Sequence, residues 1–107
     1  MVKLVKFLLA ASLALLHAEA TAQAWPAKPV RLLMPFPAGT GPDVVARLLG
    51  ARLSGIWGQQ VVVENRPGAG GVAGMGALVN STPDGYTLAL VPTTVVTLTP
   101  VLLKDPP

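Results

Sequence analysis

Two glycine-rich segments contain the residues of this sequence that could do chemistry. PFPAGTGPD (residues 35–43) and NRPGAGG (residues 65–71) each lie between an apolar run and a helical pattern. The first turn of a helix has unpaired N–H groups and a partial positive charge, and glycine lets a carboxylate or phosphate approach the backbone closely. Both segments could therefore bind an anion. On spacing alone, however, a glycine loop before a helix is more often only a tight connection.

Four polar side chains in the segments that follow the strand-like runs have two interpretations each. Asp43 could act as a catalytic acid, but a carboxylate in the first turn of a helix more commonly stabilises that turn. Arg66 could clamp an anion, although an arginine in a loop is usually only solvated. Thr93 and Thr94 could donate hydroxyl hydrogen bonds to a ligand, or they could satisfy the backbone of their own turn. The residue types alone leave these alternatives open.

The second loop also matches a dinucleotide-binding pattern. GAGGVA (residues 68–73) satisfies G-x-G-x-x-(G/A), follows a strand-like run and opens a helix. A dinucleotide site would need an acidic residue at the end of the next strand, but that strand ends at Val91 and Pro92, and Asp84 lies in the turn before it. An enzyme lobe that binds a phosphate or dinucleotide is therefore the weaker alternative.

The elements that must position these loops alternate between strand and helix. Gly58 ends the first helical pattern, whose apolar residues fall at 44, 45, 48, 49, 53, 56 and 57, the spacing of one helical face. The sequence predicts strands over residues 30–34, 60–64 and 86–91 and helices over residues 43–57 and 72–80. This βαβαβ order predicts an α/β fold with a parallel sheet and right-handed crossovers. Ligands of such sheets bind at the carboxyl ends of the strands, where both glycine loops and Thr93–Thr94 fall.

The first 24 residues have the layout of a cleavable secretory signal peptide. A basic start with Lys3 and Lys6 is followed by the apolar run FLLAASLALL and by the small-x-small site ending at Ala24, with Ala20 as an alternative cleavage point. The apolar run is too short to span a bilayer of about 30 Å. We therefore expect residues 25–107 to be the mature segment, exported to a bacterial periplasm.

The composition of the mature segment excludes several classes of function. It has six basic and four acidic residues, a charge too small and too scattered for a nucleic-acid surface. It has no cysteine and, because His17 lies in the leader, no histidine. We therefore expect no disulfide, no Cys or His metal site, no cofactor and no nucleophile that depends on histidine. The short length and the ending Lys104-Asp-Pro-Pro107 predict that the chain is a fragment.

Three motifs in this order resemble a known family. WPAKPVRLLMPFPAGTGPDVVARLL, then WGQQVVVENRPGAGGVAG, then PDGYTLAL are similar to the N-terminal part of the tripartite tricarboxylate transporter substrate-binding proteins, the Bug-type extracytoplasmic receptors. The resemblance covers essentially the whole mature segment. It implies a two-lobed periplasmic binding protein of type II, not an enzyme, that closes around a small carboxylate and delivers it to membrane permease subunits. Residues 25–107 would form part of the first lobe, and we expect the second lobe to lie outside this sequence.

The resemblance also implies a set of ligand-binding residues. Backbone amides of the two glycine loops would hold one carboxylate of the ligand, and the polar residues after the third strand would complete this side of the pocket. The implied residues are Phe36, Pro37, Ala38, Gly39, Thr40, Gly41, Asp43, Gly68, Ala69, Gly70, Gly71, Thr93 and Thr94.

This sequence departs from the family pattern at three positions. Ala38 and Thr40 replace a proline and a glycine of the first loop, and Thr99 stands before Pro100 where the family commonly has asparagine. Thr40 adds a Cβ and a hydroxyl where the backbone is otherwise bare, so the preference for ligands can differ. A single lobe cannot close on a ligand, and a bound anion would then face water, where hydrogen bonds contribute little net free energy. The remaining alternative is a truncated product without binding function.

Overall fold

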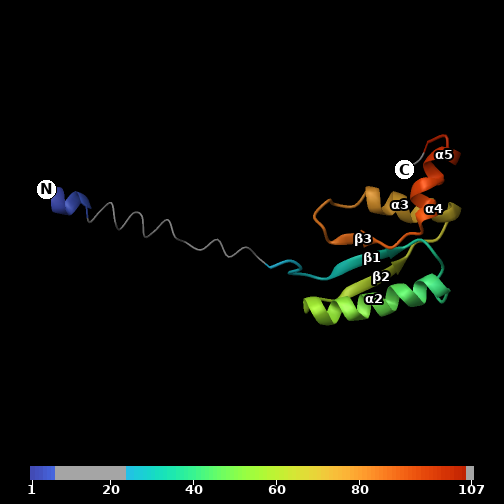
Figure 1. The fold of residues 1–107 in the computed structure, drawn as a ribbon, viewed down its shortest axis with the longest axis horizontal. Helices are drawn as coiled ribbons and strands as arrows, with labels where there is room; N and C mark the ends of the chain where they lie inside the picture. Colours follow the sequence, from blue (N-terminus) through green and yellow to red (C-terminus); the bar gives the residue numbers. More distant parts are fainter. Residues whose placement is uncertain (7–23, 106–107) are drawn as a thin grey trace.

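The protein has an α/β fold around a parallel three-stranded sheet (Figure 1). The computed structural model describes residues 1–6 and 24–105. The strand order is β2-β1-β3, and β1 pairs in parallel with both neighbours. The elements in chain order are β1 (Val30–Met34), α2 (Gly41–Trp57), β2 (Val61–Asn65), the 3₁₀ turn η1 (Ala69–Gly71), α3 (Val72–Val79), β3 (Thr87–Ala89), α4 (Thr93–Thr97) and α5 (Thr99–Leu102). The predicted parallel βαβαβ arrangement is confirmed.

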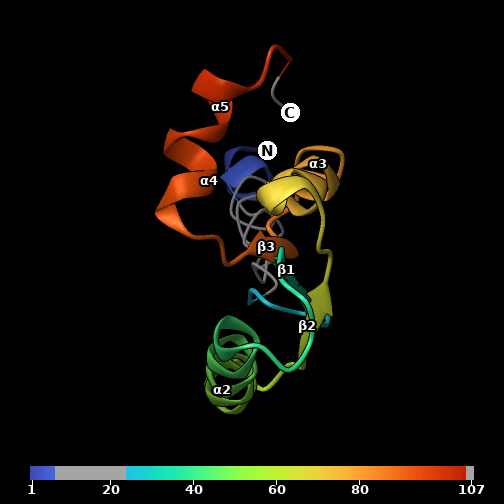
Figure 2. The ribbon, with the colours of Figure 1, turned by 90° about the vertical axis from the view of Figure 1, so that its right-hand side faces the viewer.

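Helices cover both faces of the sheet. Helix α2 packs on β1 and β2 from one side, whereas α3 contacts β1 and β3 from the other. Figure 2 shows α2 on one side of the sheet, with α3, α4 and α5 on the opposite side. Strand β1 is consequently buried on both faces, and Arg31 is the one exposed residue of its five. This burial explains why the strand reads as a nearly continuous apolar run.

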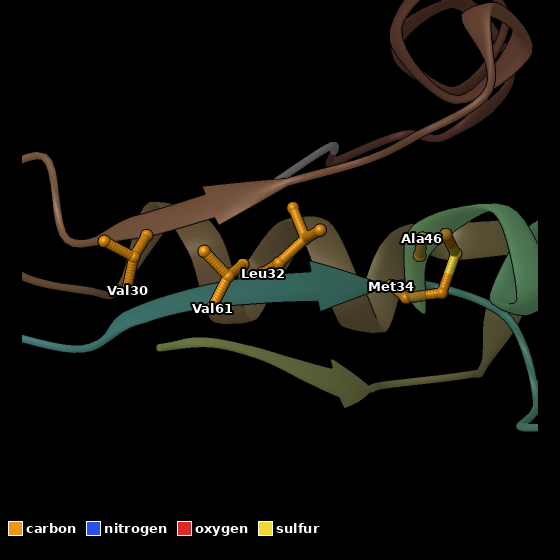
Figure 3. Packing of buried hydrophobic residues seen from close by; sticks show 5 residues of the cluster. All are labelled: Val30, Leu32, Met34, Ala46 and Val61. Atoms are coloured by element: carbon orange, nitrogen blue, oxygen red, sulfur yellow. The ribbon is translucent and has the colours of Figure 1, made fainter. Parts of the chain in front are cut away.

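The hydrophobic core lies between β1, β2 and α2. Its buried cluster consists of Val30, Leu32, Met34, Ala46 and Val61, which Figure 3 shows side by side. Small residues let α2 approach the sheet closely. A Cβ added at Gly50, for example, would lie 3.4 Å from Cγ2 of Val63.

The predicted apolar face of α2 is mostly wrong. Leu53 and Trp57 pack against the core, but the other five apolar residues of that face, Val44, Val45, Leu48, Leu49 and Ile56, are exposed. The buried positions are Asp43, Ala46 and Gly50. Residues three and four apart share a helical face, so close packing through the small side chains turns the larger apolar ones outward.

The bounds of the other elements differ from the prediction by a few residues. Helix α2 ends as expected, because Gly58 adopts a left-handed conformation (φ 65°) and its N–H donates to the carbonyl of Ser54. Strand β2 begins and ends one residue later than predicted, and β3 has three residues rather than six. The segment after β3, expected as a polar loop, forms α4 and α5.

The predicted leader falls mainly outside the described residues. Its apolar run and its cleavage site lie within residues 7–24, of which only residue 24 is described. Among residues 1–6 and 24–105, no helix combines the length and the apolar character that a membrane span requires.

Candidate functional site

A hollow of about 340 Å³ lies at the carboxyl ends of the strands, where the loops after β1, β2 and β3 meet. Parallel strands bring their carboxyl ends to one edge of the sheet, so three loops far apart in the sequence converge there. The residues that line the hollow are Pro35, Phe36, Pro37, Pro67, Gly68, Ala69, Gly70, Gly71, Pro92 and Thr94. None of these residues is acidic.

The buried side chain of Asp43 holds the loop after β1 in place. The side chain of Asp43 is buried, and its carboxylate accepts hydrogen bonds from the N–H of Gly39 (2.8 Å), from Nε of Arg47 (2.9 Å) and from Nδ2 of Asn65 (2.8 Å). Gly39 has φ 83°, a conformation that glycine adopts without strain. Asp43 thus supports the loop and does not line the hollow. The family resemblance placed it among the ligand-binding residues. Its burial and its partners depend on tertiary structure, so the sequence could not reveal them.

The hydrogen bonds of Asp43 stabilise its charged form. The bond from Asn65 contributes most, followed by the bonds from the Gly39 amide and from Arg47, and together they lower the pKa of Asp43 to about 2. The carboxylate therefore stays ionised at neutral pH. It does not supply a proton, so the alternative of a catalytic acid at this position has no support in its geometry.

Asn65 is the residue of this site that sequence reasoning missed. Its Nδ2 donates to the carbonyl of Phe36 (3.0 Å) as well as to Asp43, and its Oδ1 accepts from Arg47 (3.0 Å). One side chain therefore connects the end of β2 to the loop after β1 and to α2. The available signal was a polar amide immediately after an apolar strand, next to the glycine loop.

The glycine loop after β2 has a backbone that other residues adopt only with strain. Gly68, Gly70 and Gly71 all have positive φ, and Ala69 does as well (φ 46°). The carbonyl of Gly68 accepts the N–H groups of Gly71 (3.0 Å) and Ala73 (3.4 Å). Within the described residues, the amides of Ala69 and Gly70 donate to no protein acceptor. Ala69 and Gly70 line the hollow just before α3 begins, where the helix dipole is positive.

Two glycines of this segment also allow close packing. A Cβ on Gly71 would lie 2.7 Å from Cγ2 of Val95, and a Cβ on Gly74 would lie 2.8 Å from Cβ of Pro35. Helix α4 is thereby seated on the glycine loop through Val95, which is buried. The same packing places Thr94 at the hollow.

The structure brings only some of the predicted site residues to the hollow. Thr93 does not line it, and its carbonyl accepts the hydroxyl of Thr97 (3.0 Å). Thr40 also lies outside, with its hydroxyl donated to the carbonyl of Pro37 (2.8 Å). The predicted residues that line the hollow are Phe36, Pro37, Gly68, Ala69, Gly70, Gly71 and Thr94, and those that do not are Ala38, Gly39, Thr40, Gly41, Asp43 and Thr93.

Arg66 does not face the hollow, because it is paired with Glu64. Nε of Arg66 donates to Oε1 of Glu64 (2.7 Å), and Arg31 donates to the other carboxylate oxygen (2.7 and 3.0 Å). Hydrogen bonds from Arg31 and then from Arg66 hold the pKa of Glu64 below its usual value. The guanidinium of Arg66 belongs to an exposed ion-pair cluster, so its use as an anion clamp has no support here.

Comparisons with known proteins bear on the family and the fold of this chain. A model described as the tripartite tricarboxylate transporter family receptor matches residues 29–106. A UPF0065 protein of Bordetella bronchiseptica is 42% identical over 95 residues, which are 89% of this chain and 28% of that protein. A solved structure of a periplasmic transporter matches with a TM-score of 0.74 and 40% identity, over 78% of this chain and 28% of the other.

A third relative has been solved with a carboxylate. The R. palustris protein Rpa4515, solved with adipate, matches with a TM-score of 0.64 and 37% identity, over 66% of this chain and 24% of that one. The part of this chain that matches the Bordetella relative spans only 28% of that protein's length. Since the family model covers most of the sequence, the chain belongs to the tripartite tricarboxylate transporter family of receptors.

Proposed function

We propose that this chain binds the carboxylate of a small organic acid as part of a periplasmic receptor. The receptor performs no chemical step and delivers its ligand to the permease subunits of a tripartite transporter. Membership of the receptor family supports this function, and the adipate found with the R. palustris protein supports a carboxylate as ligand. Residues 1–24 act in this proposal as the leader that directs export.

The observation that carries the proposal is that the amides of Ala69 and Gly70 donate to no protein acceptor within residues 1–6 and 24–105. Backbone N–H groups without a partner favour an acceptor, and a carboxylate is the strongest acceptor that a small organic acid offers. The hollow has no acidic lining that would repel an anion, because Asp43 is buried and Glu64 is held by two arginines. Thr94 supplies a hydroxyl at the same place.

The remaining loop residues support the hollow from outside. Asp43 and Asn65 fix the loop from Phe36 to Gly41, and the hydroxyl of Thr40 closes that loop on Pro37. We assign these residues a positioning role. In this arrangement Thr40 affects the preference for ligands through the shape of the loop rather than by direct contact.

An NMR titration of the ¹⁵N-labelled full chain with adipate tests the function. We expect the amide signals of Ala69 and Gly70 to move most, with weak affinity because the hollow is open to water. Adipamide has the same skeleton without charge and should leave these signals in place. A chain that gives no response to adipate but binds a nucleotide would be a dinucleotide-binding lobe instead.

Replacing Thr94 with valine tests the site within the same titration. The change removes one hydroxyl donor at nearly constant volume, so we expect adipate affinity to fall roughly two- to tenfold, as loss of one hydrogen bond predicts. Thr82→Val is the matched control, because Thr82 is also exposed but lies in the turn before β3. Equal losses in both variants, or a melting curve without a cooperative transition, would contradict the proposal.

A further inference from the structure

A second hollow, of about 270 Å³, adjoins the first one between the glycine loop and the helices α4 and α5. The two hollows share Ala69, Gly70 and Thr94 in their linings. Figure 2 shows α4 and α5 on the same side of the sheet as α3. The lining of the second hollow extends from Ala69 and Gly70 to residues of these two short helices.

The lining of this second hollow is mostly apolar. Besides the three residues shared with the first hollow, it is lined by Val72, Leu98, Leu102 and Leu103 and by one polar residue, Thr99. Leu102 is 77% exposed and Leu98 53% exposed, so these side chains offer apolar surface that the described residues leave uncovered. Burying such surface is favourable in proportion to its area.

We infer that the ligand is an amphiphilic carboxylate whose methylene chain lies along Leu98 and Leu102 while its head group occupies the amide hollow. This inference rests on the proposed function and adds the class of substrate. The amide hollow, at about 340 Å³, is near the lower limit of the roughly 300 to 1,000 Å³ usual for ligand sites, so a longer ligand must extend beyond it.

The rival direction is a third hollow on the side of α2, which is lined by Met34, Val45 and Leu90 and is also apolar. It shares Phe36 and Pro92 with the amide hollow, but neither Ala69 nor Gly70 lines it. A chain attached to a carboxylate at these two amides therefore reaches the leucines of α4 and α5 directly. Val95, seated against Gly71, keeps those helices beside the amides.

The test is a titration of the full chain with acetate, butanoate, hexanoate and octanoate. We expect affinity to rise with each added methylene by up to about fourfold, which corresponds to complete burial of one CH₂ group. Leu102→Ser should remove most of this dependence on chain length. Val101→Ser is the matched control, because Val101 is its neighbour in α5, is 79% exposed and does not line the hollow.

The outcomes of this series distinguish a failure of the inference from a failure of the proposed function. If acetate binds but affinity does not rise with chain length, the inference is wrong and the proposed function stands. The same conclusion follows if hexylammonium binds as tightly as hexanoate. If Val45→Ser flattens the series while Leu102→Ser does not, the chain of the ligand lies in the rival hollow and the inference is wrong. If no carboxylate binds, the inference and the proposed function fall together.

Discussion

Asp43 joins three segments of the chain through one buried carboxylate. It holds the loop after β1 through Gly39, the end of β2 through Asn65, and its own helix through Arg47. Each donor satisfies a charge that would otherwise be costly to bury. The shape of the loop at the candidate site therefore depends on a residue that does not line the hollow.

The stability of the chain should depend on the ionisation of Asp43 at low pH. Its pKa is lowered from 3.8 to about 2 in the folded state, so between these values the unfolded chain binds more protons. Stability from this group is then complete above about pH 4 and is lost as the pH falls toward 2. Urea unfolding should show a stability difference between the wild-type chain and Asp43→Asn that shrinks across this window. A difference that is constant with pH would refute the expectation.

Gly71 is the position at which we expect the largest effect of a single methyl group. Alanine there would have φ 103° and a Cβ 2.7 Å from Val95, so strain and overpacking together should lower the free energy of unfolding by about 2 kcal/mol or more. Gly76→Ala, on α3 with no atom within 4 Å of the added Cβ, should raise it by roughly 0.5 to 1 kcal/mol. Chemical denaturation of both variants measures the contrast, and equal effects would count against this packing.

At the scale of elements, helix α2 turns its small residues toward the sheet and its larger apolar residues outward. Ala46 is fully buried, whereas Leu48, two residues later, is 64% exposed. The close approach positions the start of α2 beside the loop after β1. The orientation of this helix therefore contributes to the shape of the carboxyl edge.

Two substitutions on α2 test this orientation. Ala46→Leu inserts a larger side chain between α2 and β1 and should lower the free energy of unfolding by about 1 to 3 kcal/mol. Leu48→Gln changes a more hydrophobic but exposed position and should alter it by less than about 0.5 kcal/mol. Denaturant midpoints of the two variants are compared with that of the wild-type chain. A larger loss of stability in Leu48→Gln than in Ala46→Leu would instead support the apolar face predicted from the sequence.

At the scale of the whole molecule, the candidate site is open on one side. The three loops form a hollow at an edge of the sheet, and the chain spans 28% of the length of its Bordetella relative. Ligand sites usually bury about 70 to 90% of a small ligand, and hydrogen bonds strengthen where water is excluded. The affinity of this chain alone should accordingly be limited by exposure of the bound anion.

A chimera tests the effect of enclosing the ligand. The matching segment of the R. palustris protein solved with adipate is replaced by the corresponding segment of this chain, which is 37% identical to it. We expect the chimera to bind adipate at least about tenfold more tightly than this chain alone, because enclosure strengthens each hydrogen bond. Calorimetric titration of both proteins gives the ratio. A folded chimera that binds no better than the chain would contradict this account of the open site.

The order of elements and the position of the hollow were predictable because they depend on local signals. Apolar runs, Gly58 and the two glycine loops establish βαβαβ, and parallel strands necessarily collect their loops at one edge. The pairing of Asp43 with Asn65 was not predictable, since the two residues are 22 positions apart and meet only because β2 lies beside β1. The contact of Val95 with Gly71 was not predictable either, because it depends on how α4 packs against the loop after β2.

The sequence by itself determined the family and its parallel architecture, because short motifs and periodicity are properties of neighbouring residues. Only the tertiary structure decided which face of α2 is buried, since that depends on how closely Ala46 and Gly50 can approach the sheet. Only the tertiary structure separated Thr94, at the hollow, from Thr93, outside it. Both decisions follow from the packing of one element on another, which a linear pattern does not contain.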